Sequence, residues 1–165
     1  MKDKFNYIKS SINKLASIIE APEKLIPTFG NSTDSHPNIE ISDTGQFSYE
    51  IFERGQEIKR DYALDLDHLL YIVFRDITGS MAIEFASKNS QPNVDIRRVR
   101  FQKQLELLGK LKREWEQKEK EYQAGIASQI QFTDYAGQKD AYLRYLIANG
   151  FLYSEAIEKA NTKFP

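Results

Sequence analysis

The N-terminal residues alternate polar and apolar positions with the period of an amphipathic helix. The apolar side chains are three or four residues apart and would share one face: Phe5, Ile8, Ile12, Leu15 and Ile19. Pro22 and Pro27 then stop helix propagation, and residues 30–37 are rich in turn-forming types. The pattern therefore predicts one helix with a single buried face, followed by a loop.

The next part of the chain changes to the alternation that is typical of β-strands. Apolar and polar residues alternate at 39–41 and again at 47–51, and turn-forming residues occur at 43–45. A second turn at 54–55 precedes a weaker third strand at 56–62. We predict a three-stranded antiparallel β-meander, which must pack on helices because so small a sheet is marginally stable alone.

The helical period returns after residue 64. Asp65 can accept hydrogen bonds from the free amides of a helix start, and apolar residues from Leu66 to Phe85 cover a wide face. This width predicts the central, most buried helix. Gly79 in its interior costs about 1 kcal/mol relative to alanine, which a close crossing with another helix would offset.

Three further helices are predicted in the second half of the chain. Residues 94–122 carry one apolar stripe that ends at Trp115, so we expect a single long helix whose charged end projects into solvent. Shorter helices are expected at 139–149 and 154–160. The complete pattern predicts an α+β fold in which a small antiparallel three-stranded β-meander packs beside a layer of long α-helices.

Composition adds limits to this fold. The chain has 165 residues and 41% hydrophobic residues, which predicts a single α+β domain over residues 1–165. It has no cysteine, which excludes disulfides and thiolate zinc sites and fits a reducing compartment. No secretory signal opens the chain, and its longest apolar run, 69–74, is far shorter than the ~20 residues of a membrane span. We expect a soluble cytoplasmic protein.

Charge is distributed unevenly along the chain. Residues 32–67 hold nine acidic and three basic side chains, a net charge of −6, whereas the whole chain has −1. Such a segment attracts a basic partner and repels nucleic acid. The alternative interpretation is a solvated sheet face that protects an edge strand from aggregation. Phe52 has the strand parity opposite to Phe47 and Ile51, so it is the aromatic residue expected on the exposed side.

Candidate catalytic patterns are weak. The sequence contains no HExxH, GxSxG, P-loop, GxGxxG or EF-hand motif, so no cofactor is predicted. Two alternatives stay open. Glu50, Glu53 and Asp61 would serve a metal-dependent enzyme if they converged across the meander. The basic run at 97–103 would contact nucleic acid in a regulator, although acidic residues further along favour an ion-paired helix face.

Four segments together suggest a family. They are IIEAPEKLIPTFG at 18–30, FSYEIFERGQEIKR at 47–60, LDHLLYIVFRDITGSMAIEF at 66–85 and RRVRFQKQLELLGKL at 97–111. Their order resembles the immunity protein 63 family of bacterial polymorphic toxin systems, over about residues 1–122. None of these segments is a catalytic motif.

The resemblance implies a non-enzymatic protein that binds and neutralises a cognate protein toxin. A basic toxin would suit the acidic segment, and the partner-facing set is predicted as Glu50, Phe52, Glu53, Arg54, Glu57 and Asp61. The structural alternative is that residues 53–57 form a specific turn packed on the next helix. Residues 124–165 lie beyond the part that resembles the family and are predicted to form a helical C-terminal extension of the single domain. Its candidate roles are capping the helical layer, forming a homodimer or adding toxin contacts.

Overall fold

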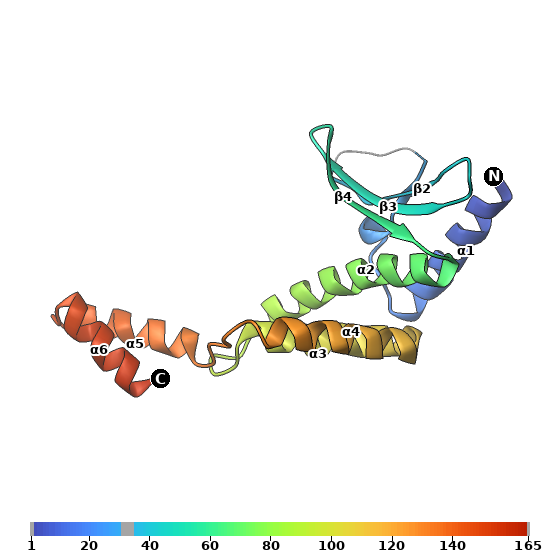
Figure 1. Cartoon of the computed structure of the whole chain (residues 1–165). Coiled ribbons are helices and arrows are strands. Elements are labelled where there is room, and N and C mark those ends of the chain that lie inside the picture. Colours follow the sequence, from blue (N-terminus) through green and yellow to red (C-terminus); the bar gives the residue numbers. More distant parts are fainter. Residues whose placement is uncertain (1, 31–34, 165) are drawn as a thin grey trace.

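The computed structural model describes residues 2–30 and 35–164. Within these residues the fold is α+β, as predicted, with six α-helices, one short 3-10 helix and four strands (Figure 1). Their order is α1 Lys2–Ile18, η1 Glu23–Leu25, β1 Thr28–Phe29, β2 Asn38–Ile41, β3 Phe47–Glu53, β4 Gln56–Ala63, α2 Leu66–Lys88, α3 Ile96–Leu111, α4 Arg113–Ala127, α5 Ala136–Ala148 and α6 Tyr153–Lys163. Part of the loop expected at 30–37, residues 31–34, lies outside the described residues.

The sheet is mixed, which corrects the prediction of three antiparallel strands. Its strand order is β1-β2-β3-β4, and β1 pairs with β2 in parallel while the other neighbours are antiparallel. The added strand is only two residues long, and the Thr28 amide donates to the Pro37 carbonyl at 2.8 Å. A strand this short has no alternation to detect, so only its pairing with β2 reveals it.

One hydrophobic core joins the sheet to the helices. It includes Ile8 and Ile12 of α1, Ile39 of β2 and Tyr49 of β3. As predicted, α2 is central. Asp65 caps its start by accepting from the His68 amide at 2.8 Å, and nine of the 23 residues of α2 are buried, among them Phe74. No helix in the described part of the chain is long and apolar enough to cross a membrane.

The predicted single helix over 94–122 is wrong. The chain is extended at Lys112 (φ −160°, ψ 128°), which ends α3 and starts α4. α4 then runs back along α3 and packs on it. The Gln123 side-chain amide donates to the Gln104 amide oxygen at 3.3 Å and to the Phe101 carbonyl at 3.4 Å. Glu119 and Gln123, which were expected in solvent, are therefore buried and continue the apolar stripe beyond Trp115 at four-residue spacing.

The C-terminal helices α5 and α6 pack on each other and lie beyond the far ends of α3 and α4 from the sheet (Figure 1). Their small core contains Leu146, Ala156 and Ala160. Gly150, at φ +88°, occupies the left-handed conformation that ends α5. Asp95, the cap of α3, holds the linker between α4 and α5 by accepting a hydrogen bond from the Thr133 amide at 2.8 Å.

Candidate functional site

The β3–β4 hairpin carries the predicted partner-facing residues. Arg54 and Gly55 have φ values of +52° and +75°, which is the backbone that a tight two-residue hairpin turn requires. The turn reaches away from the helices at the top of Figure 1. We call residues 52–58 the hairpin end. Ile58, at a bulge in the pairing of β4, is 60% exposed there.

The structure gathers four of the six predicted residues at the hairpin end. Glu53, Arg54 and Glu57 are exposed, and Phe52 is half-buried opposite Glu57. The other two point to opposite faces of the sheet, because Glu50 pairs with Arg60 in the register whereas Asp61 pairs with Tyr49. Glu50 is only 4% exposed, so its carboxylate is covered, and it is paired with Arg60.

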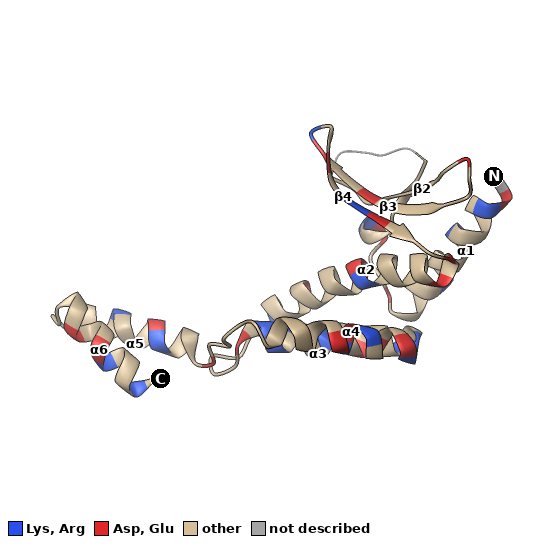
Figure 2. Cartoon of the chain, viewed as in Figure 1, with Lys and Arg blue, Asp and Glu red and all other residues tan. Residues whose placement is uncertain are grey.

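The hairpin carries both acidic and basic residues (Figure 2), and most of its acidic side chains form ion pairs with basic ones. Arg60 forms ion pairs with Glu50 and, at 2.7 Å, with Glu57, and its hydrogen bond to Glu57 raises the pKa of the guanidinium. Lys59 pairs with Asp61 at 3.1 Å. The local field is therefore weaker than the number of acidic residues in the hairpin suggests. Glu53 is the exposed acidic residue of the hairpin end that has no ion pair within the described residues.

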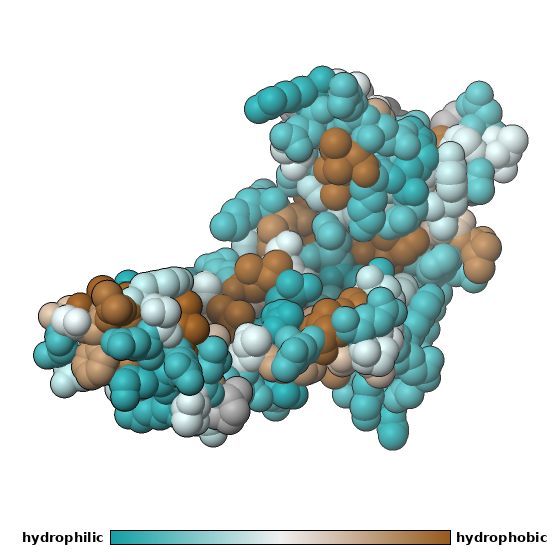
Figure 3. Space-filling model, turned by 60° about the vertical axis from the view of Figure 1, so that its left-hand side comes forward, coloured by the Kyte–Doolittle hydropathy of each residue, from teal (hydrophilic) through white to brown (hydrophobic). Residues whose placement is uncertain are grey.

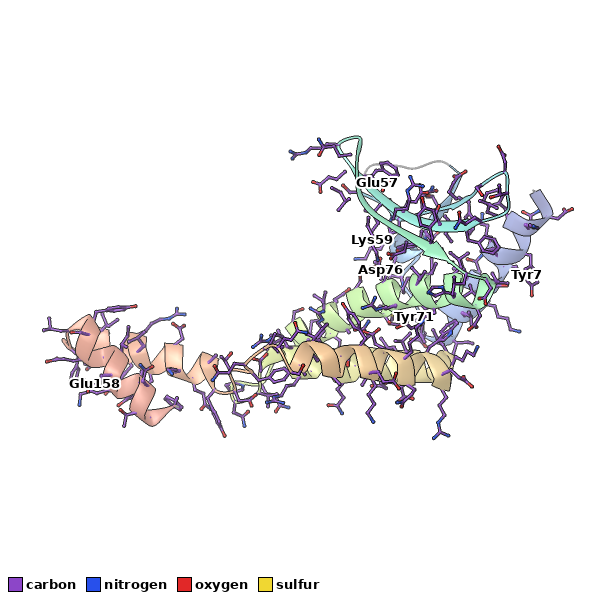
Figure 4. The ribbon with its side chains drawn as sticks, in the orientation of Figure 1. Tyr7, Glu57, Lys59, Tyr71, Asp76 and Glu158 are labelled. Atoms are coloured by element: carbon purple, nitrogen blue, oxygen red, sulfur yellow. The ribbon has the colours of Figure 1, made fainter. Side chains whose placement is uncertain are left out.

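A cleft of about 790 Å³ lies beside β4. Its walls come from Lys59–Tyr62 of β4, His68–Ile83 of α2, Arg100–Gln104 of α3 and Lys118–Ile126 of α4. Figure 4 shows Lys59 and Asp76 where β4 passes α2, and Tyr71 on the side of α2 that faces α4. The cleft exists because α4 folds back along α3, and the single helix predicted over 94–122 would not form it.

Glu119 organises the part of the cleft formed by α2 and α4. It is buried, and its carboxylate accepts hydrogen bonds from Arg75 Nε at 2.8 Å and from the Tyr71 hydroxyl at 3.1 Å. Burial, together with this carboxylate, raises the pKa of Tyr71 to about 12. The Arg75 guanidinium also lies 3.8 Å from the centre of the Tyr122 ring. A charged, hydrogen-bonded network thus holds Tyr71 and Arg75 in place.

A second network connects β3 to α2. The buried Tyr49 hydroxyl donates to Asp76 at 2.7 Å, and burial followed by the Asp76 charge raises the pKa of Tyr49 far above its ordinary value. Lys59 Nζ lies 5.2 Å from the centre of the Tyr49 ring. These contacts fix the β4 side of the cleft against α2.

The structure gives little support to the two alternative site predictions. Within residues 2–30 and 35–164, no group of three or more histidine or acidic side chains is arranged to hold a metal ion. In the basic run, Arg97 pairs with Asp95 at 2.6 Å, Arg98 with Asp134 at 3.2 Å, and Lys103 with Glu106 at 3.0 Å. Arg100 is the cation of this run that lines the cleft.

Comparison with known families gives one match. The family model described as immunity protein 63 matches residues 43–124. The resemblance found in the sequence is confirmed, but the match begins at residue 43 rather than near the N-terminus. It covers β3, β4 and α2 to most of α4, and so contains both the hairpin end and the cleft. No curated protein and no solved structure matches the chain.

Proposed function

Residues 43–124 belong to the immunity protein 63 family, and from this premise we propose that the protein binds a cognate toxin and neutralises it. The proposed activity is binding, without a catalysed reaction or a cofactor, and takes place in the cytoplasm of the cell that is protected. We treat the chain as one domain with residues 124–165 as its extension.

The observation that carries this proposal is the exposed hairpin end within the matched region. Ile58 is an aliphatic side chain left in solvent, with charged Glu53, Arg54 and Glu57 around it. An apolar anchor surrounded by charges is a common arrangement in protein interfaces. We propose that basic side chains of the toxin face Glu53 and Glu57, while Phe52 and Ile58 supply apolar contact.

Glu50 and Asp61 have supporting roles in this proposal. Glu50 holds Arg60, which in turn holds Glu57, and Asp61 holds Lys59. We therefore expect substitutions at these two positions to act through the shape of β4, and substitutions at Glu53 and Ile58 to act on binding directly.

Co-purification with tagged full-length protein tests the proposal. We expect mass spectrometry to find a stoichiometric partner that arrests growth when it is expressed alone and is tolerated when the wild-type chain is co-expressed. The double variant Glu53→Lys, Ile58→Asp should lose the partner and the protection. Asp43→Lys is the matched control, because Asp43 is exposed at the turn between β2 and β3 inside the same matched region.

Two results would contradict the proposal. A partner whose toxicity is unchanged by the wild-type chain would exclude neutralisation. Equal protection by the double variant and the control would exclude the hairpin end as the interface while leaving the family role intact.

A further inference from the structure

We propose that the cleft between β4, α2, α3 and α4 is a second docking site, which takes an extended acidic segment of the partner protein. This inference rests on the proposed function and deepens it, because it assigns a chemistry to one part of the partner. The cleft lies beside the hairpin end, so one partner can reach both (Figure 4).

The charges of the cleft carry the first step. Glu119 is already paired with Arg75, and Asp61 with Lys59, while Asp76 accepts the hydrogen bond of Tyr49. The two cations that α3 and α4 contribute to the cleft differ from these groups, because they have no acidic ion-pair partner in the described structure. Across the described chain, neither Arg100 nor Lys118 has an ion pair: Lys118 Nζ lies 4.2 Å from the centre of the Tyr71 ring, and the Arg100 guanidinium lies 5.7 Å from that of Phe101.

Arg100 also has a hydrogen-bond donor that lacks an acceptor. Among the described residues, its Nε is the one buried side-chain nitrogen or oxygen atom that has no hydrogen-bond partner. A buried donor without an acceptor is destabilising, because it has lost its hydrogen bond to water without gaining another. A carboxylate oxygen placed in the cleft would provide a charged acceptor for this guanidinium group, and this is the ligand that its geometry favours.

Apolar side chains from three elements border the same cleft. Tyr62 of β4, Ile83 of α2 and Tyr122 of α4 are 56%, 52% and 50% exposed. In Figure 3, hydrophobic side chains lie between the sheet and the helices. A free protein gains nothing from leaving these groups in water, whereas a docked segment would cover them. The occupant should therefore combine carboxylates with apolar residues.

The length of the cleft indicates an extended conformation. From His68 to Ile83 the α2 wall runs roughly 22 Å at 1.5 Å per residue, which equals about seven residues of extended chain. β4 is an edge strand of the sheet, so within residues 2–30 and 35–164 its outer backbone groups face no further strand. Nucleic acid fits less well, because its phosphates would meet Asp61, Asp76 and the acidic hairpin end.

A peptide-display selection on the immobilised full-length protein tests this chemistry without any toxin. The probe is a library of random twelve-residue peptides. We expect enrichment of sequences that carry several Asp or Glu residues among apolar ones. Binding of a selected peptide should weaken as salt rises, and should be at least about tenfold weaker for Lys118→Glu with Arg100→Gln.

Lys120→Glu is the matched control, since Lys120 is exposed on the same helix and does not line the cleft. It should bind the selected peptides within about twofold of wild type. If Arg100→Gln impairs folding, Lys118→Glu alone decides, because Lys118 is exposed and its removal leaves the Glu119 network in place.

The inference is overturned if the selection enriches no peptides, or neutral or basic ones. It is also overturned if Lys118→Glu binds like Lys120→Glu, or if a twelve-nucleotide single-stranded DNA binds more tightly than the selected acidic peptides. Acidic peptides that bind in the cleft while no toxin is ever neutralised would leave this inference standing and reject the proposed function, so the two failures are distinguishable.

Discussion

The hairpin end and the cleft differ in how their charges are used. The hairpin belongs to the most acidic segment of the chain, yet Glu50, Glu57 and Asp61 are paired with basic residues of β4. The cleft is built from helices of mixed charge, yet Arg100 and Lys118 have no ion pairs within the described structure. Ion pairing, more than the number of charges in a segment, therefore decides which charge a surface offers to a partner.

Backbone geometry explains this difference. Antiparallel register places Glu50 directly opposite Arg60, so acids and bases on neighbouring strands meet across the hairpin. On α4 the carboxylate of Glu119 turns inward to Arg75 and Tyr71, whereas Lys118 one position earlier stays outside. Two sites of different character next to each other would orient a partner as well as hold it.

The largest effect on stability is expected from substitution of Glu119, the buried carboxylate of the cleft. Glu119→Gln removes the negative charge that faces Arg75 and weakens the hydrogen bond from Tyr71, so we expect the free energy of unfolding to fall by about 2–3 kcal/mol. Urea unfolding measures this. Glu121→Gln, on the exposed side of the same helix, should change stability by less than about 0.5 kcal/mol. Equal effects would show that Glu119 does not organise the cleft.

Alkaline pH should loosen the cleft before the hairpin end. The pKa of Tyr71 is about 12 in the folded protein against an ordinary value of 10.0. Between these values the folded state binds the proton that the unfolded state has lost, so stability falls as pH rises from 10 towards 12. The slope is at most about 1.4 kcal/mol per pH unit for each such tyrosine.

Urea unfolding at pH 9, 10 and 11 measures that slope. Tyr71→Phe should flatten it, and the remaining slope should come from Tyr49, whose pKa is also raised by burial. An unchanged slope in Tyr71→Phe would mean that Tyr71 titrates normally in the folded protein.

A smaller effect is expected inside the hairpin. Glu50→Gln removes the buried carboxylate that accepts from Ser48 at 2.5 Å and from Arg60, but Arg60 is partly exposed and keeps Glu57. We expect a loss of about 1 kcal/mol in the free energy of unfolding. Partner recovery by this variant in the co-purification assay should stay close to that of wild type, whereas its loss would place Glu50 in the interface.

The smallest effect is expected at the solvent-facing member of the same ion-pair network. Glu57→Gln breaks an ion pair between two partly exposed side chains, so stability should change by less than about 0.5 kcal/mol in thermal or urea unfolding. A loss as large as that of Glu50→Gln would remove the distinction between the buried and the exposed carboxylate.

Much of the fold could be predicted from local patterns. The stripe of α1, the cap of α2 at Asp65 and the turn at Arg54-Gly55 all follow from residue type and spacing, and each agrees with the structure. The hairpin end could be predicted as well, because Glu53, Arg54 and Glu57 are near neighbours in the chain. The cleft could not, since its walls are separated by up to 67 positions along the sequence, from Lys59 to Ile126.

Sequence alone determined the helical and strand periods, the acidic segment and the match of residues 43–124 to the immunity protein 63 family. Tertiary structure decided which polar residues are inside. Glu119 and Gln123 lie in a stretch that looks wholly solvent-facing, and they become buried only because the chain reverses at Lys112 and places α4 on α2 and α3. A polar side chain satisfied by a distant partner has the same local pattern as one satisfied by water, so the difference appears only when the partner is in place.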